Sequence, residues 1–227
     1  LNITQFYKMG GDPNNPKRIL GGAQDNGTNI LESSILKHWA GGDGMECFVN
    51  PDNPEILYGE AQNGRLFKSI DNGLTYSSII PTYEGSFGGI RPVNGDWVTP
   101  FIIDPNDSET LYAAYSTPHL GYTQSIYKSI NGGDSWVHIS TPTNKGINHI
   151  MVAPSNSNAI YFSAKDEMYK TTDGGKNWSN ISEGLGATFY PYGASFPIKP
   201  IISYFVIDPL DENKVWVTLS GYYQDEK

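Results

Sequence analysis

The stretch KSIDNGLTYSSI, residues 68–79, contains a short motif that the chain repeats twice more. In each copy a Ser or Thr is followed at alternate positions by Asp or Asn, by Gly and by a polar residue, and an aromatic residue comes next. The copies comprise Ser69, Asp71, Gly73 and Tyr76; Ser129, Asn131, Gly133 and Trp136; and Thr171, Asp173, Gly175 and Trp178. Repetition of this kind predicts a protein built from copies of one structural unit.

Each copy has the chemistry of a tight turn between two strands. The Asp or Asn side chain accepts hydrogen bonds from backbone N–H groups two or three residues further along the chain. The Gly suits a position with positive φ, and the aromatic residue begins the next strand and packs on the core. We therefore interpret the motif as a structural element of a β-hairpin.

Five prolines define a second repeat. Each one ends an apolar strand, a polar turn follows, and a new strand begins six residues after the proline. Proline ends a strand because it has no N–H to donate, and Asn, Asp and Ser supply the turn. The prolines are Pro13, Pro51, Pro105, Pro154 and Pro209, at intervals of 38, 54, 49 and 55 residues. Such intervals are typical of four-stranded propeller blades with loop insertions.

Together the two repeats predict an all-β fold, a β-propeller of four-stranded antiparallel blades. About five blades fit the chain, the first and last of them partial, whereas an intact ring has roughly seven. The expected blades of this single segment occupy approximately residues 1–44, 45–97, 98–146, 147–200 and 201–227. Because each blade buries both faces against neighbours, we expect the remaining blades on another chain or in the rest of a parent sequence.

Composition restricts the partners of the chain. Its 227 residues carry a formal charge of −9, which disfavours nucleic acid and anionic membrane surfaces as partners. No apolar run approaches the ~18 residues that a spanning helix needs, so no membrane insertion is expected. Cys47 is the single cysteine, which excludes an internal disulfide and a cysteine metal cluster. Phosphate-loop, dinucleotide and histidine metal motifs are also absent from the sequence, so we expect no cofactor.

The three turn motifs resemble the Asp-box, or BNR repeat, of a superfamily of β-propellers. That superfamily includes sialidases, endo-xyloglucanase-like glycoside hydrolases and sortilin-type receptors. The copies depart from its pattern at Tyr76, which replaces Trp, at Asn131, which replaces Asp, and at Thr171 and Asn177 in the third copy. The resemblance implies the propeller fold, with the motifs at the blade periphery and remote from a ligand.

A second set of segments resembles bacterial secreted proteins that are labelled as glycosyl hydrolases with BNR repeats. The segments are GGAQDNGT (21–28), WAGGDG (39–44), EAQNG (60–64) and IRP (90–92), in that order. The resemblance implies a bacterial protein that is extracellular or on the cell surface, with a polysaccharide or protein ligand.

Polar residues that follow equivalent expected strands are candidates for a ligand site. Propellers generally bind ligands on loops at one mouth of the central channel. The candidate ligand-binding residues are Gln24, Asn26, Gln62, Asn63, Arg91 and Trp97. Amide groups bond to sugar hydroxyls, an Arg can clamp an anionic group, and aromatic rings stack on sugar rings. Further aromatic residues in expected long loops are Tyr83, Phe87, Tyr190 and Tyr192.

Asp25 and Asp43 are the candidate catalytic residues. Glycosidases use two carboxylates, ~5 Å apart in retaining enzymes and ~6.5–9.5 Å apart in inverting ones. The endo-xyloglucanase-like family places a catalytic Asp after an early inner strand in a D-I-G-G setting, whereas Asn-Gly-Thr follows Asp25. A sialidase is discounted, because its three gripping arginines would require Arg18, Arg65 and Arg91 all to converge.

The same two carboxylates have other interpretations. Asp-Asn-Gly and Gly-Asp-Gly form turns without any substrate. Asp25 and Asp43 would also suit Ca²⁺, which prefers oxygen ligands, although their spacing has no EF-hand form.

Three functions therefore remain open. The first is a binding module that holds a glycan or a peptide at the channel mouth, the second is a glycoside hydrolase, and the third is a scaffold of a surface complex. A mouth lined by paired carboxylates would favour the hydrolase, aromatic walls would favour binding, and a plugged mouth would favour the scaffold.

Overall fold

A computed structural model describes residues 4–84, 90–117, 123–186 and 199–220. Within these ranges the chain forms strands and turns, and it has no helix long and apolar enough to cross a membrane. Four sheets have four strands each, and two sheets have two strands each.

The sheets follow one another along the chain. The four-stranded sheets are β1 (Phe6–Asp12), β2 (Asn15–Ala23), β3 (Gly27–Glu32) and β4 (Ile35–Ala40); β5 (Gly44–Val49), β6 (Leu57–Ala61), β7 (Arg65–Ser69) and β8 (Ser77–Ser78); β11 (Phe101–Asp104), β12 (Asp107–Thr117), β13 (Thr123–Ser129) and β14 (Val137–Ser140); and β15 (His149–Ala153), β16 (Asn156–Ala164), β17 (Glu167–Thr171) and β18 (Ser179–Asn180). The two-stranded sheets are β9 (Thr82–Glu84) with β10 (Ile90–Pro92), and β19 (Ile201–Ile207) with β20 (Val215–Ser220).

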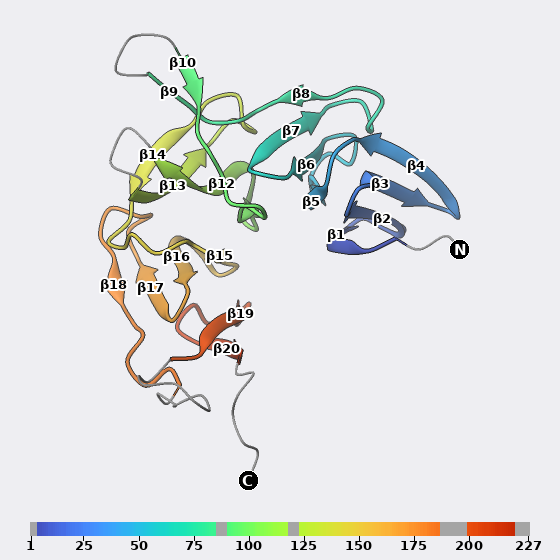
Figure 1. The fold of residues 1–227 in the computed structure, drawn as a ribbon. Coiled ribbons are helices and arrows are strands. Elements are labelled where there is room, and N and C mark those ends of the chain that lie inside the picture. Colours follow the sequence, from blue (N-terminus) through green and yellow to red (C-terminus); the bar gives the residue numbers. More distant parts are fainter. Residues whose placement is uncertain (1–3, 85–89, 118–122, 187–198, 221–227) are drawn as a thin grey trace, which may run out of the picture.

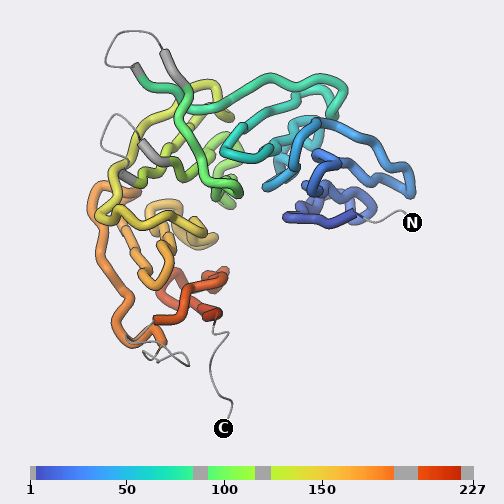
Figure 2. Tube along the Cα trace, in the orientation of Figure 1, coloured from blue at the N-terminus to red at the C-terminus, as the bar shows by residue number. Residues whose placement is uncertain are grey.

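Every four-stranded sheet is an antiparallel meander in which each strand pairs with the next one along the chain. Figure 1 shows these sheets fanned along an open arc, with β1, β5, β15 and β19 toward the common centre and β4, β8, β14 and β18 toward the outside. The Cα trace in Figure 2 follows the same arc from one end of the chain to the other. The predicted all-β propeller architecture, present as an incomplete set of blades, is therefore confirmed.

The first blade corrects one detail of that prediction, because it has all four strands. Its outer strands β3 and β4 are joined through Ser33 and Ser34, whose φ angles are 48° and 71°. Two consecutive residues with positive φ form the kind of two-residue turn that suits the twist of a hairpin. Asn-Gly usually marks such a turn, so the Ser-Ser connection gave no sequence signal.

The connection between the second and third blades contains a hairpin that the sequence did not predict. Strands β9 and β10 pair here, and Tyr83 lies opposite Arg91. Tyr83, which we expected in a ligand-facing loop, packs instead against the hydrophobic cluster between these two blades. Phe87, Tyr190 and Tyr192 lie outside the described residues, as does the side chain of Arg91.

The hydrophobic core is divided into clusters that lie between neighbouring blades. One cluster joins Leu20 and Ile30 of the first blade to Val49 and Leu57 of the second. Three further clusters fill the next interfaces along the arc in the same way. At the first interface Gly22 lies so close to the second blade that a Cβ there would be 2.1 Å from the Met45 carbonyl oxygen. Each blade thus depends on its neighbours for burial, as repeat proteins do.

The three turn motifs adopt one hydrogen-bonding pattern. In the first, Gly73 donates its N–H to Ser69 Oγ at 2.9 Å, and Thr75 donates its N–H to Asp71 Oδ1 at 2.9 Å. The second and third copies repeat both bonds at 2.9–3.1 Å. The central glycines, Gly73, Gly133 and Gly175, have φ angles of 77°, 93° and 95°. These hydrogen bonds hold the pKa values of Asp71 and Asp173 at about 2, and Asn131 supplies the same acceptor without a charge.

The aromatic residue of the motif links its blade to the preceding one. Trp136 donates its indole N–H to the Ile79 carbonyl oxygen at 2.8 Å, and Trp178 donates to the Ser140 carbonyl oxygen at 3.1 Å. Tyr76 occupies the same position in the first motif and packs against Phe67 with ring centroids 5.2 Å apart. A phenol has no indole N–H, so the first motif lacks this link.

Trp136→Phe is expected to lower the free energy of unfolding by about 1–2 kcal/mol, because it keeps an aromatic ring but removes a hydrogen bond to a part-buried carbonyl and part of the packed indole. Tyr76→Phe at the equivalent position is the matched control, with a change within about 0.5 kcal/mol. Urea unfolding followed by circular dichroism measures both. Equal midpoints for the two variants would contradict the proposed link.

Candidate functional site

Three turns meet on one face of the first two blades, which we call the candidate face. They are the turns after β2, β4 and β6, whereas the turn motifs and the proline turns lie on the opposite face. The Asp43 carboxylate accepts the backbone N–H of Asp25 at 2.7 Å, and Gln62 Oε1 accepts the N–H of Asp43 at 2.9 Å. Gln62 also donates its N–H to the Asp43 carbonyl oxygen at 3.1 Å. The predicted proximity of these residues across two blades is what the structure shows.

Asp25 differs from Asp43 in what its side chain does. The Asp43 carboxylate is engaged with the backbone of the neighbouring turn and is partly buried. Asp25 is exposed, has a φ of 57°, and its carboxylate makes no hydrogen bond to another described residue. A non-glycine residue with positive φ is a departure from the preferred backbone, and such departures gather at functional sites and in turns. Asp25 is thus the carboxylate that remains open to a ligand.

A cavity of about 340 Å³ lies beside Asp25. Its wall includes Asp25, Asn26, Asn29 and His38, together with the apolar side chains of Phe6 and Leu36. The side-chain amide of Asn26 donates a hydrogen bond to the Gln24 carbonyl oxygen at 2.9 Å, which stabilises the turn. The backbone of Gln24 is fixed in turn by a 2.9 Å hydrogen bond to the Gln5 carbonyl oxygen, just before β1. Apolar surface next to a few polar groups is typical of pockets that bind small molecules.

Asn63 and Trp97 extend the candidate face toward the third blade. Asn63, with a φ of 65°, donates its N–H to the Trp97 carbonyl oxygen at 3.4 Å and accepts the N–H of Gly95 at 3.2 Å. The Trp97 indole reaches back to the hydroxyl of Tyr7 on β1 at 3.4 Å, while half of the Trp97 side chain is exposed. An aromatic ring held in this way is suited to stacking on a sugar ring.

A buried carboxylic acid, Glu60, lies beneath the candidate face. The sequence did not mark Glu60 as a site residue. It lies in β6 with no exposed surface, accepts the Thr99 N–H at 2.7 Å and accepts the Glu46 N–H at 3.3 Å. Burial raises the pKa of Glu60 to about 8, against the opposing effect of these two hydrogen bonds. Glu60 connects β5, β6 and the segment before β11, so its role is to hold the face together.

A second cavity, of about 300 Å³, is lined by residues of the first strands of the sheets, β1, β5, β11, β15 and β19, and we call it the axial cavity. Lys8 of β1 and Glu46 of β5 form an ion pair on one wall of it, with Nζ and Oε1 3.0 Å apart. His149 of β15 and Tyr204 of β19 line the other side. The sequence did not predict this cavity. The available signal was a charged or imidazole side chain near the start of three of the inner strands, β1, β5 and β15, which an apolar core would not contain.

Metal binding has no support among the described residues. No group of three or more His, Cys, Asp or Glu side chains in the described ranges is placed to hold an ion. The proposed Asp25 and Asp43 pair lacks a third carboxylate there, and Asp43 is engaged with the backbone. Cys47 is buried, and burial raises the pKa of its thiol to about 12, so it behaves as a core residue.

Comparison with curated proteins finds similarity to two xyloglucanases, while no family model matches the chain. The xyloglucanase of Hypocrea jecorina is 26% identical over a match that covers 66% of this chain and 20% of that protein. The xyloglucanase of a Paenibacillus species is 28% identical over 61% of this chain and 15% of that protein. The chain therefore spans a fifth or less of the length of these relatives.

Solved structures share the fold. A crystal structure of an ancestral GH74 enzyme matches 91% of this chain and 26% of its own, with a TM-score of 0.65 and 16% identity. The GH74 enzyme of Niastella koreensis matches 95% of this chain and 44% of its own, with a TM-score of 0.55 and 17% identity. A chain of the outer coat vertex of COPII on membranes reaches a TM-score of 0.54 at 13% identity, over 83% of this chain and 53% of its own. The fold thus serves unlike functions, and the xyloglucanase matches add support for a glycoside hydrolase-like propeller.

Proposed function

We propose that the candidate face is a polysaccharide-binding surface of an extracellular or cell-surface propeller. The observation that carries this proposal is the cavity beside Asp25, where an open carboxylate and the amides of Asn26 and Asn29 adjoin the apolar surface of Phe6. Carboxylates and amides bond sugar hydroxyls, and apolar rings pack on the C–H faces of sugars. The similarity to two xyloglucanases supports a β-glucan chain as the ligand class.

The same proposal includes the arrangement of the blades. The five blades would occupy residues 1–44, 45–97, 98–146, 147–200 and 201–227, and further blades on another chain or in a parent sequence would close the ring. Apolar side chains at the two ends of the arc support this: Ile35 of the first blade is 61% exposed, and Val206 and Trp216 of the last are 45% and 49% exposed. Neighbouring blades would cover them, as the internal interfaces are covered.

Glycoside hydrolysis is the second candidate function, because both curated relatives are named for it. Asp25 would be the carboxylate that touches the substrate. Asp43 Oδ1 is 2.7 Å from the Asp25 nitrogen, so the two carboxylates belong to one small site, and Asp43 would act as the partner or as the group that positions Asp25. Chemistry of this class needs two carboxylates on the scissile bond.

Asp25→Asn is the substitution that tests both functions. If the face binds a glycan, the substitution is expected to raise the Kd for a xyloglucan oligosaccharide by about tenfold, because one charge-assisted hydrogen bond is lost. Isothermal titration calorimetry measures this change. If the protein also hydrolyses the glycan, release of reducing ends is expected to fall by a factor of at least 10². Asp52→Asn, an exposed carboxylate on the opposite face, is the control and should change neither quantity.

Two variants of Asp43 separate a positioning role from a direct one. Asp43→Asn keeps an oxygen that accepts the Asp25 N–H, whereas Asp43→Ala removes it. Binding that survives in Asp43→Asn but fails in Asp43→Ala indicates positioning of Asp25. If the unmodified protein binds no β-glucan and releases no reducing ends, both proposed functions are wrong.

A further inference from the structure

The polar part of the axial cavity lies next to the candidate face. Its polar residues lie near the N-terminal ends of the inner strands: Lys8 in β1, Glu46 in β5 and His149 at the start of β15. Those strand ends are next to the candidate turns, since Gln24 is bonded to the residue before β1 and Asp43 directly precedes β5. A chain-like ligand on the candidate face can therefore extend into the axial cavity.

The charges in the axial cavity neutralise each other. Lys8 Nζ and Glu46 Oε1 are 3.0 Å apart, and each side chain retains about a quarter to a third of its exposure, at 31% and 25%. Burial is the main effect on the pKa of Glu46 and raises it, although Lys8 opposes that rise. The pair offers N–H donors and carboxylate oxygens to a ligand without a net charge.

His149 adds a directed acceptor. Its Nε2 lies 2.7 Å from the Ser203 carbonyl oxygen, and because a carbonyl oxygen only accepts, Nε2 carries the proton. The second ring nitrogen, Nδ1, of the neutral imidazole is then an acceptor. Burial and the nearby Lys8 ammonium lower the pKa of His149, which favours the neutral form.

Tyr204 supplies the apolar wall. Its ring meets the His149 ring edge-on, with centroids 5.2 Å apart and an interplanar angle of 76°, and about half of the side chain is exposed. The thioether side chains of Met9 and Met151 lie along the same cavity. An aromatic face next to paired donors and acceptors is the combination that holds a sugar ring.

We infer that the axial cavity is a second subsite that binds one neutral sugar residue of the glycan. This inference rests on the proposed function, which gives a glycan as the ligand. The residues of the cavity then favour a neutral sugar over a charged one. The ion pair has no net charge, so a uronate carboxylate or an amino-sugar ammonium gains no net attraction there and must compete with Glu46 or Lys8 for its partner, whereas a hydroxyl can bond to both.

The test is calorimetric titration of the whole chain with three oligosaccharides of equal length: a neutral β-glucan, an oligogalacturonate and a chitosan oligomer. We expect the neutral ligand to bind at least tenfold more tightly than either charged one. Tyr204→Ala and His149→Phe are each expected to raise the Kd for the neutral ligand about tenfold. Tyr76→Ala, which removes a similarly exposed tyrosine on the opposite face, is the matched control. Circular dichroism melting of each variant shows whether it is folded.

The possible outcomes separate the two proposals. Loss of affinity in Asp25→Asn with none in folded Tyr204→Ala and His149→Phe overturns the axial subsite and leaves the candidate face standing. The reverse result supports the axial site and overturns the role of the candidate face. Equal affinity for neutral and charged ligands contradicts the selection argument, and no binding of any oligosaccharide overturns both proposals.

Discussion

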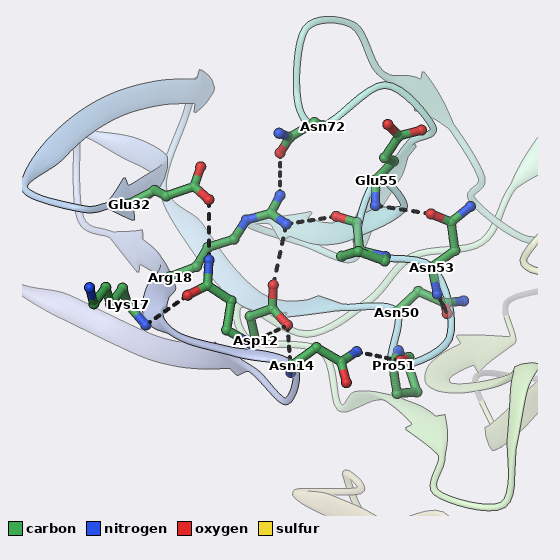
Figure 3. A network of polar contacts seen from close by, with 12 residues as sticks. Asp12, Asn14, Lys17, Arg18, Glu32, Asn50, Pro51, Asn53, Glu55 and Asn72 are labelled. Carbon is green, nitrogen blue, oxygen red and sulfur yellow. Dashed lines mark hydrogen bonds and ion pairs between the residues drawn. The ribbon is translucent and has the colours of Figure 1, made fainter.

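Arg18→Met is expected to lower the free energy of unfolding by about 3–5 kcal/mol, because it leaves a buried carboxylate without its cation. Arg18 on β2 and Asp12 on β1 are almost fully buried, with Nη1 and Oδ2 3.4 Å apart. Figure 3 shows that the same guanidinium reaches across to the second blade, where Nη1 donates to the Pro54 carbonyl oxygen at 2.7 Å and Nη2 donates to Asn72 Oδ1. One side chain therefore ties a strand of the first blade to two turns of the second.

The neighbouring contacts increase this expected effect. Asn14 donates its side-chain amide to the Pro51 carbonyl oxygen at 2.6 Å, beside the Arg18 contacts in Figure 3. Equivalent bonds run from Asn50 to the Ser108 carbonyl oxygen and from Asn106 to the Ala153 carbonyl oxygen at the next two interfaces. Among the described residues, only the first interface has a buried ion pair in addition to this repeated amide contact. Its stability should therefore be the most sensitive to a single polar substitution.

Guanidinium chloride unfolding of three variants tests the prediction. Arg65→Met removes an exposed arginine on the candidate face and is expected to change the stability by less than about 0.5 kcal/mol. The double variant Arg18→Met, Asp12→Asn should regain part of the loss, since it removes the uncompensated charge. A midpoint for Arg18→Met that matches that of Arg65→Met would show that the ion pair contributes little.

The sequence was sufficient to predict the repeated turns, but it was insufficient to predict the contacts between blades and the cavity lined by the inner strands. The turn motifs around Asp71, Asn131 and Asp173 are local, because each is closed by hydrogen bonds within five residues, and such a pattern is readable in one dimension. Arg18 and Glu60 have nearer partners in Asp12 and Glu46, but each also bonds residues 36 to 54 positions away along the chain, and no local pattern encodes those distant contacts. The proximity of Asp25 and Asp43 was predictable because, in an antiparallel meander, the turn after the second strand and the connection after the fourth lie on the same face.

The roles of individual side chains at that site were not predictable. Both Asp25 and Asp43 stand within two residues of a glycine in turn-forming sequences, so the sequence gives no reason to assign them different roles. The structure distinguishes them through a single hydrogen bond, which engages the Asp43 carboxylate and leaves the Asp25 carboxylate open. Similarly, the strand sequence LYGEA reads as a half-buried strand with a polar edge, yet all five residues are buried.

Glu60→Gln is expected to abolish a fall in stability that the unmodified protein shows as pH rises from about 4.5 to about 8. The folded-state pKa of Glu60 is raised from 4.5 to about 8 by burial. Between those values the native state holds a proton that the unfolded state releases, so the free energy of unfolding decreases with rising pH. The slope from this one group is at most about 1.4 kcal/mol per pH unit.

The measurement is the difference in free energy of unfolding between the variant and the unmodified protein, taken by urea titration at several pH values from 5 to 9. The glutamine keeps an oxygen for the Thr99 N–H but turns an amide toward the Glu46 N–H, so the variant should be the less stable protein at pH 5. As pH rises, the unmodified protein loses stability and the variant does not, so the difference should shrink and then change sign near or above pH 7. Glu55→Gln, an exposed carboxylate on the opposite face, should give a difference that stays flat across the series. A flat difference for Glu60→Gln as well would mean that the buried carboxylate is already ionised in the folded protein at pH 5, with the Thr99 and Glu46 N–H groups outweighing its burial.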